Sequence, residues 1–181
     1  MAGSHLALLR GINVGKAKRV AMADLRALVA DLGYLEVRTL LNSGNVLFTV
    51  PRTARGDPAG RIERAIVSRL GVSTRVTVLT AAELAAIVRG NPLLKVANNP
   101  SRLLVSILSN PGDRARLEPL VLQAWAPDAM ALGTRVCYLW CASGILESRL
   151  AEAVGRVLGD AATSRNWATI LKLHDLAGDG Q

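Results

Sequence analysis

The turn between two short β-rich runs constrains the fold of this chain most strongly. The runs cover residues 37–41 and 46–50, and the four residues between them are Asn42–Asn45, with the sequence Asn-Ser-Gly-Asn. Glycine and asparagine tolerate the positive φ angles that a tight hairpin turn requires. We therefore expect an antiparallel strand pair here, and the other elements must be arranged around it.

The elements on either side of this hairpin follow a regular order. An apolar run at His5–Leu9 predicts a first strand, and apolar residues at helical spacing predict a helix over 22–32. After the hairpin, a helix is expected from an Asp-Pro start to a glycine stop over 57–71, and the alternating run 74–79 predicts a fourth strand. The order β-α-β-β-α-β is that of a ferredoxin-like unit.

The second half of the chain repeats most of this order. A capping box at Thr80–Glu83 begins a further helix, and Asn91–Pro100, which contains two Asn-Pro steps, is the expected junction between lobes. Beyond it we expect a strand at 103–108, a turn at 110–113, a helix toward Trp125, strands at 129–132 and 136–141, and helices at 150–158 and 167–176. The prediction is an α+β protein of two lobes, 1–90 and 91–181. The second is a similar β-α-β-β-α unit with an extra C-terminal helix.

Composition places the chain among globular proteins. Half of its residues are apolar and a fifth are charged. Apolar runs such as Val136–Ala142 are far shorter than the roughly 18 residues of a membrane span. The N-terminus lacks the basic flank and long apolar stretch of a signal peptide. We expect a cytoplasmic protein without a membrane segment.

Two cysteines, Cys137 and Cys141, lie on one face of an expected strand. Four residues of extended chain separate them by about 13 Å, which is too far for a disulfide. A zinc site needs about four ligands, and no histidines cluster nearby. We expect buried thiols, no metal and no cofactor.

The net charge of +8 is unevenly distributed. Residues 1–90 contain 13 Lys and Arg against 6 Asp and Glu, a net charge of +7, whereas residues 91–181 contain 9 against 8, a net charge of +1. A basic first lobe attracts anions such as nucleic acid or phosphorylated metabolites. The alternative is a basic surface that is simply solvated.

The glycine-containing loop after the first strand resembles a phosphate-binding loop only in part. Residues Gly11–Ala17 read Gly-Ile-Asn-Val-Gly-Lys-Ala, with three residues between the glycines instead of four and alanine after the lysine. A nest of backbone N–H groups at Gly11 and Gly15, beside Arg10 and Lys16, is one interpretation. The other is a tight connection in which the glycines only satisfy φ.

The position of the other two polar motifs bears on whether one pocket exists. From the order of the strands we expect the hairpin turn to project from the end of the sheet where the first strand starts, opposite the Arg10 loop. In the third motif, Ser164–Trp167, Ser164 or Asn166 is expected to cap a helix while Trp167 packs inward. Arg165 is the candidate anion clamp of this motif.

Three stretches together resemble a known family. They are Arg10–Gly15 (Arg-Gly-Ile-Asn-Val-Gly), Asn42–Phe48 (Asn-Ser-Gly-Asn-Val-Leu-Phe) and Thr163–Trp167 (Thr-Ser-Arg-Asn-Trp). The chain resembles the bacterial domain-of-unknown-function family 1697. The resemblance implies a two-subdomain α+β fold and no agreed activity. Lys16 stands where a second glycine is common in the family, and Ala21 where proline often begins the first helix.

Three hypotheses about function follow. The first is non-catalytic binding of a phosphate-bearing ligand, with nucleic acid as one candidate. The second is a metal-independent enzyme acting on a small anionic metabolite, and the third is a structural or protein-interaction module. The candidate ligand-binding residues are Arg10, Gly11, Asn13, Gly15, Lys16, Asn42, Ser43, Asn45, Arg165, Asn166 and Trp167, with Lys18 and Arg19 as further basic contacts. No catalytic residue stands out, because neither His5 nor His174 has a motif partner.

Overall fold

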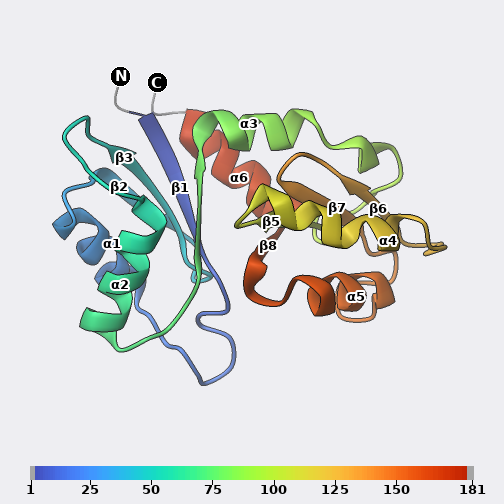
Figure 1. Cartoon of the computed structure of the whole chain (residues 1–181), viewed down its shortest axis with the longest axis horizontal. Coiled ribbons are helices and arrows are strands. Elements are labelled where there is room, and N and C mark those ends of the chain that lie inside the picture. The colour runs from blue at the N-terminus through green and yellow to red at the C-terminus, as the bar shows by residue number, and fades with distance from the viewer. Residues whose placement is uncertain (1–2, 179–181) are drawn as a thin grey trace. The chain divides into compact units, whose positions relative to one another are not determined.

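A computed structural model describes residues 3–178 of the protein (Figure 1), and the chain contacts divide them into two units. Unit 1 contains residues 3–84 together with 176–178, and unit 2 contains residues 85–175. Among the described residues, each unit has one four-stranded antiparallel sheet with helices. The predicted α+β class is confirmed.

Unit 1 has the predicted β-α-β-β-α-β order. Its strands are β1 (Gly3–Leu9), β2 (Leu35–Leu40), β3 (Asn45–Val50) and β4 (Val76–Thr80), and its helices are α1 (Met22–Asp31) and α2 (Pro58–Leu70). The strands lie in the order β2-β3-β1-β4, and every neighbouring pair is antiparallel. Strand β1 is therefore central, as in a ferredoxin-like sheet.

Local sequence explains where the elements of unit 1 begin and end. The Asp57 carboxylate accepts hydrogen bonds from the backbone N–H groups of Ala59 and Gly60, so it caps the first turn of α2. Gly71 ends this helix with a φ of 66°, a conformation that glycine adopts without steric cost. The caps expected at the two ends of this helix are both confirmed.

One face of this sheet forms the core of unit 1 with α1 and α2, which lie side by side in Figure 1. Leu9 and Phe48 of the sheet belong to one buried cluster with Leu25 of α1 and Ile66 of α2. The Tyr34 ring contacts Phe48, with ring centroids 4.8 Å apart. Each such fully buried side chain contributes roughly 1.5–3 kcal/mol to folding.

Unit 2 repeats the topology of unit 1. Its strands are β5 (Leu103–Leu108), β6 (Ala129–Leu132), β7 (Val136–Trp140) and β8 (Ala162–Asn166), in the order β6-β7-β5-β8. The helical segments of the remaining chain are α3 (Ala81–Arg89), η1 (Pro92–Lys95), η2 (Pro111–Leu117), α4 (Glu118–Val121), α5 (Arg149–Leu158), η3 (Gly159–Ala161) and α6 (Trp167–Gly178). Because the first strand is central in both sheets and the strand order is the same, the fold supports a duplicated unit.

Strand β8 corrects the predicted order of the second lobe, which had no fourth strand. Residues 162–166 pair with β5 along their whole length, so unit 2 is a complete β-α-β-β-α-β unit followed by α6. The sequence Ala-Thr-Ser-Arg-Asn has no alternation of large apolar residues, and such polar edge strands carry a weak pattern. The strand is recognised from its backbone pairing with β5.

The segment between β5 and β6 also differs from the expected helix toward Trp125. It consists of the 3-10 helix η2 and a single α turn, α4, which ends at Val121. Pro119 lies in the first turn of α4, where its missing N–H costs nothing, but its ring cannot lie deeper in a helix. Two apolar residues of this segment, Leu117 and Leu120, are buried and still reach the core, whereas Leu122 is exposed.

The cysteines are as the sequence predicts. Cys137 and Cys141 are free thiols and both are buried. Burial raises the pKa of the Cys137 thiol to about 12. Among residues 3–178, no helix combines the length and apolar character that crossing a membrane requires.

Candidate anion-binding loop

The loop after β1 and the β2–β3 hairpin turn lie against each other. The Leu9 backbone N–H donates to the Gly44 carbonyl oxygen at 2.8 Å, and the Asn13 amide nitrogen donates to the Asn42 carbonyl oxygen at 2.7 Å. The expectation that these segments lie at opposite ends of the sheet is therefore wrong. Strand β3 runs antiparallel to β1, so its first residue, Asn45, pairs with Leu8 near the end of β1.

Asn13 closes the base of the loop. Its side-chain oxygen accepts from the Val20 backbone N–H at 2.9 Å, and its side-chain nitrogen donates to the Val20 carbonyl oxygen at 2.8 Å. Its own backbone N–H donates to the Lys18 carbonyl oxygen at 3.1 Å. The φ of Asn13 is 55°, in the left-handed region that asparagine tolerates better than most residues. The amide thus serves to hold residues 13–20 as a closed loop.

The hairpin turn is equally tightly built. A Cβ atom on Gly44 would lie 2.7 Å from both the Leu9 Cβ and the Ile12 Cδ1, so only glycine permits this close approach. Asn45 is fully buried, and its amide nitrogen donates to the Leu40 carbonyl oxygen and the Ser43 hydroxyl. The candidate residues Asn13, Ser43 and Asn45 therefore all take part in hydrogen bonds within the loop and the turn.

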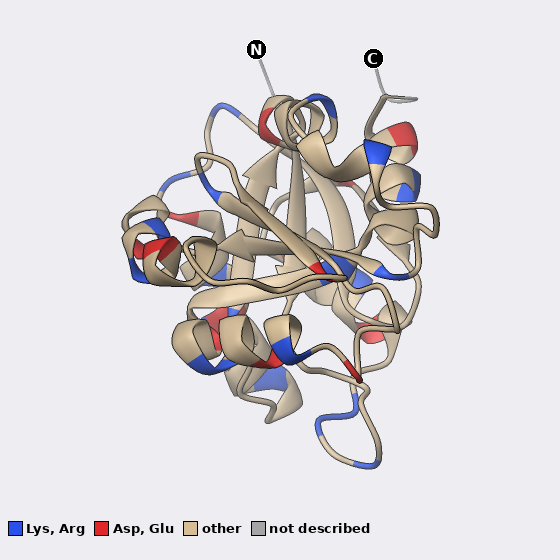
Figure 2. Cartoon of the chain, turned by 90° about the vertical axis from the view of Figure 1, so that its right-hand side faces the viewer, with Lys and Arg blue, Asp and Glu red and all other residues tan. Residues whose placement is uncertain are grey.

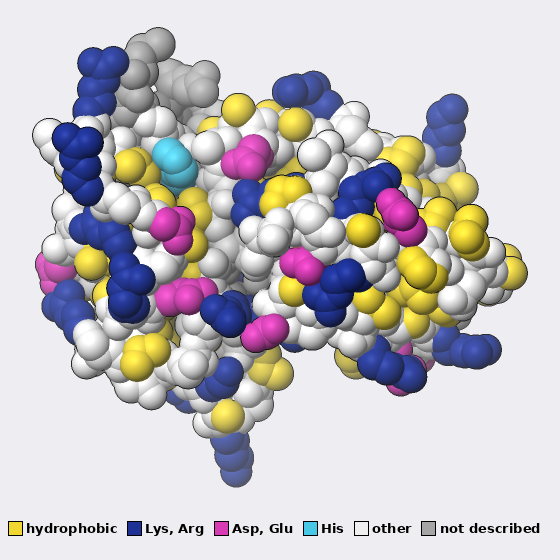
Figure 3. Space-filling view, viewed as in Figure 1, with side chains coloured by type: hydrophobic (Ala, Val, Ile, Leu, Met, Phe, Trp, Pro, Cys, Tyr) yellow, Lys and Arg dark blue, Asp and Glu magenta, His cyan; other side chains and the backbone are white. Residues whose placement is uncertain are grey.

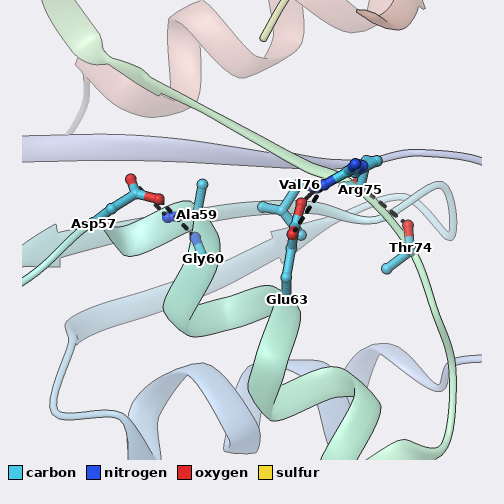
Figure 4. Close-up of polar contacts among 7 residues, drawn as sticks. All are labelled: Asp57, Ala59, Gly60, Glu63, Thr74, Arg75 and Val76. Atoms are coloured by element: carbon cyan, nitrogen blue, oxygen red, sulfur yellow. Dashed lines mark hydrogen bonds and ion pairs between the residues drawn. The ribbon is translucent and has the colours of Figure 1, made fainter. Parts of the chain in front are cut away.

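The backbone of Arg10 is held from the other side by the segment that leads into β4. The Arg10 N–H donates to the Arg75 carbonyl oxygen at 2.9 Å, and the Thr74 hydroxyl donates to the Arg10 carbonyl oxygen at 2.7 Å. Figure 4 shows how Glu63 of α2 fixes this segment: its carboxylate accepts from the Val76 N–H at 2.8 Å and lies 3.8 Å from the Arg75 guanidinium. The start of the loop is thereby anchored to β4 and, through Glu63, to α2.

Beyond this base, the loop from Val14 to Arg19 is exposed along its whole length. It lies at the bottom of Figure 2, where basic positions are blue, and in Figure 3 a Lys or Arg side chain projects at the same end of the molecule. Lys16, Lys18 and Arg19 form no ion pair with any described residue, and the sequence contains no carboxylate before Asp24. Gly11 and Gly15 have φ values of 63° and 60°. We call residues 14–19 the basic loop.

The third motif lies in unit 2. Asn166 caps α6, because its side-chain oxygen accepts from the Thr169 N–H at 2.9 Å, and Trp167 is buried. Both observations confirm the expected capping and packing. Ser164 pairs with Ser106 instead of capping. Arg165 lies on β8 and donates to the Ser164 carbonyl oxygen, and burial lowers its pKa to about 10. Two motifs thus belong to unit 1 and one to unit 2.

Sequence reasoning identified the basic residues of the loop but missed what holds them. Thr74, Arg75 and the backbone of Val20 position the loop, and none of them was a candidate. Antiparallel pairing supplies the signal for the first two, since it brings the start of the fourth strand to the end of the first strand.

Two successive ferredoxin-like units, the first with an exposed basic loop, define the class of this protein as an α+β protein of two similar lobes. The chain belongs to the family described as "Protein of unknown function (DUF1697)", whose model matches residues 3–138. The comparison with curated proteins found no significant match. Among solved structures, the chain is similar to a conserved bacterial protein from Streptococcus pneumoniae. The TM-score is 0.80 at 19% identity, over 98% of this chain and 99% of that one, and this likeness shows the shared fold.

Proposed function

We propose that the protein binds nucleic acid without catalysis, through the phosphate groups, with the basic loop as its contact surface. One observation carries the proposal: Lys16, Lys18 and Arg19 project from a loop that is closed at its base, and no described carboxylate pairs with them. Cations that are not neutralised within their own protein attract phosphates most strongly.

The construction of the loop favours binding to phosphates. The bonds of Asn13 and the anchoring of Arg10 fix the ends of the loop, so less conformational entropy is lost when its cations contact a ligand. Each phosphate contact by a lysine or arginine releases counterions, so affinity falls steeply as salt rises. Only 3% of the residues are aromatic, which favours contacts to the backbone over stacking on bases.

A salt titration with a matched control tests the proposal. Binding of fluorescent single- and double-stranded oligonucleotides is measured by anisotropy for the wild type, for Lys16→Gln/Lys18→Gln/Arg19→Gln, and for Lys95→Gln/Arg149→Gln/Lys172→Gln. Each triple variant lowers the net charge from +8 to +5. The control removes exposed cations of unit 2.

The loop variant is expected to bind weakly. The slope of log affinity against log salt concentration is expected to be smaller in magnitude by about two to three, because each lost phosphate contact reduces it by about one. The control variant is expected to keep most of the wild-type affinity. A wild type that fails to bind at low salt, or a control that loses as much affinity as the loop variant, would contradict the proposal.

A further inference from the structure

A second basic surface of unit 1 lies at the other end of the same sheet. A hollow of about 410 Å³ is lined by residues that include Leu32, Gly33, Thr53, Arg55 and Arg61. Leu32 and Gly33 precede β2, and Thr53 and Arg55 follow β3. The register that pairs Leu35 with Thr49 puts this end of the sheet opposite the basic loop.

Arg61 is held in a fixed position beside this hollow. One of its terminal nitrogens donates to the Leu32 carbonyl oxygen at 2.8 Å, and the other donates to the Tyr34 hydroxyl at 3.3 Å. Its guanidinium carbon lies 5.1 Å from the centre of the Tyr34 ring, which is buried. These bonds use two of the five N–H donors of a guanidinium. Arg61 therefore presents an oriented planar cation, with donors to spare, to the hollow it lines.

The residues that line the hollow include two arginines. No described carboxylate forms an ion pair with Arg55 or Arg61, and none of the residues that line the hollow is acidic. Three acidic residues lie within two positions of lining residues, and each has other partners. Asp31 pairs with Arg69, Glu63 accepts from the Val76 N–H and lies 3.8 Å from the Arg75 guanidinium, and the two oxygens of Asp57 accept from the first turn of α2. Arg52, between the lining residues Pro51 and Thr53, is exposed and adds a further positive charge.

We propose that this hollow binds the phosphate or diphosphate group of a small molecule. Arg61 supplies the fixed guanidinium and Arg55 a second one from the loop after β3, and a pair of arginines matches the oxygens of a phosphate with charge-assisted bonds. The Thr53 hydroxyl is a further donor beside them. Unlike the basic loop, this site is a hollow with a fixed donor, which suits a compact ligand better than a polymer.

The test uses inorganic pyrophosphate as the probe, with binding to the full chain measured by isothermal titration calorimetry. Arg55→Gln is the main variant, because Arg55 is exposed and makes no described contact on which folding depends. Arg61→Lys keeps the charge but loses the planar fork. Arg64→Gln is the matched control, an exposed arginine of the same helix that does not line the hollow.

Arg55→Gln removes a charged hydrogen-bond donor, and Arg61→Lys keeps the charge but loses the paired donors of the guanidinium, so each variant is expected to weaken pyrophosphate binding about tenfold. Arg64→Gln and the basic-loop triple variant are expected to bind as the wild type does. Absence of pyrophosphate binding to the wild type, or equal losses in Arg55→Gln and Arg64→Gln, would overturn the proposal. A short oligonucleotide without terminal phosphates that displaces pyrophosphate from the loop variant would overturn the small-molecule assignment. Because the loop variant keeps this site intact, failure here is distinguishable from failure of the nucleic-acid proposal.

Discussion

Asn13 links the conformation of the basic loop to the stability of unit 1. Its side chain bonds to both backbone groups of Val20 and to the carbonyl oxygen of Asn42, while its φ is 55°. We expect Asn13→Ala to lower the free energy of unfolding by about 2 kcal/mol, roughly half from lost hydrogen bonds and half from the positive φ.

Urea denaturation checks this value. Asn13→Gly relieves the φ strain and is expected to lose less than Asn13→Ala, and Val14→Ala, at an exposed neighbour, is expected to stay within about 0.5 kcal/mol of the wild type. An unfolding free energy of Asn13→Ala equal to that of the wild type would show that the amide does not hold the loop.

Gly44 is the residue at which the hairpin turn and the loop approach most closely. Both the φ of 79° and the 2.7 Å separations from the Leu9 and Ile12 side chains oppose a methyl group there. We expect Gly44→Ala to destabilise the protein by about 3 kcal/mol, as overpacking and backbone strain add. Gly11→Ala is the control, because its φ of 63° is similar but no atom lies within 4 Å. Thermal unfolding of both variants separates the effect of steric crowding from the effect of the positive φ. Similar losses of stability in Gly44→Ala and Gly11→Ala would contradict the contribution of crowding.

The Cys137 thiol provides a test of burial in unit 2. Its native pKa of about 12 lies above the ordinary value of 9.0, so the folded state holds the proton more tightly than the unfolded state. This contribution to stability is complete below pH 9 and is lost as the pH rises toward 12. Native protein at pH 8 should therefore react slowly with iodoacetamide at this residue, and protein in denaturant quickly, as peptide mass spectrometry would measure. Rapid native labelling would contradict the buried placement.

At the scale of elements, the cap of α2 connects helix stability with the hollow beside it. Asp57→Ala removes both cap bonds and is expected to cost about 1 kcal/mol in unfolding free energy. Asp57→Asn keeps an acceptor at the cap, so it should cost much less. Because Asp57→Asn also removes a negative charge near Arg55, this variant is expected to strengthen pyrophosphate binding. Equal stability of the alanine and asparagine variants in urea denaturation would contradict the capping role.

Most elements could be predicted because their signals are local. The turn at 42–45, the cap at Asp57 and the capping box at Thr80 each depend on a few neighbouring residues, and the structure has all three. Strand β8 was missed because its polar sequence becomes a strand only through its pairing with β5. The hairpin turn lies at the end of β1 and not at its start, because β2 runs in the same direction as β1 and β3 returns antiparallel to both.

The candidate site could be predicted in part. The basic residues of the loop are visible in the sequence, since they precede any carboxylate. The role of Asn13 cannot be predicted in the same way, because its partner Asn42 becomes a neighbour only after the sheet forms and its bonds to Val20 depend on the conformation of the closed loop. The role of Arg61 cannot be predicted for the same reason. Arg61 lies in α2, and its partners Leu32 and Tyr34 follow the end of α1.

At the scale of the whole molecule, two units of one topology carry different charges. Unit 1, residues 3–84 and 176–178, contains 12 Lys and Arg against 6 Asp and Glu, a net charge of +6, and unit 2, residues 85–175, contains 10 against 7, a net charge of +3, although the strand order of the two sheets is the same. The shared topology therefore does not explain the difference in net charge, and the excess Lys and Arg residues of unit 1 lie on its surface. The basic loop and the hollow beside Arg61 place such cations at the two ends of one sheet.

The central claim is that the basic loop contacts nucleic acid. The most direct measurement is a titration of ¹⁵N-labelled protein with a short single-stranded oligonucleotide at low salt, followed by the backbone amide shifts. The account predicts that the largest shift changes fall on residues 11–19 and on the adjoining turn at 42–44, and that they diminish as salt is added. Shift changes concentrated in unit 2, or none at low salt, would contradict it.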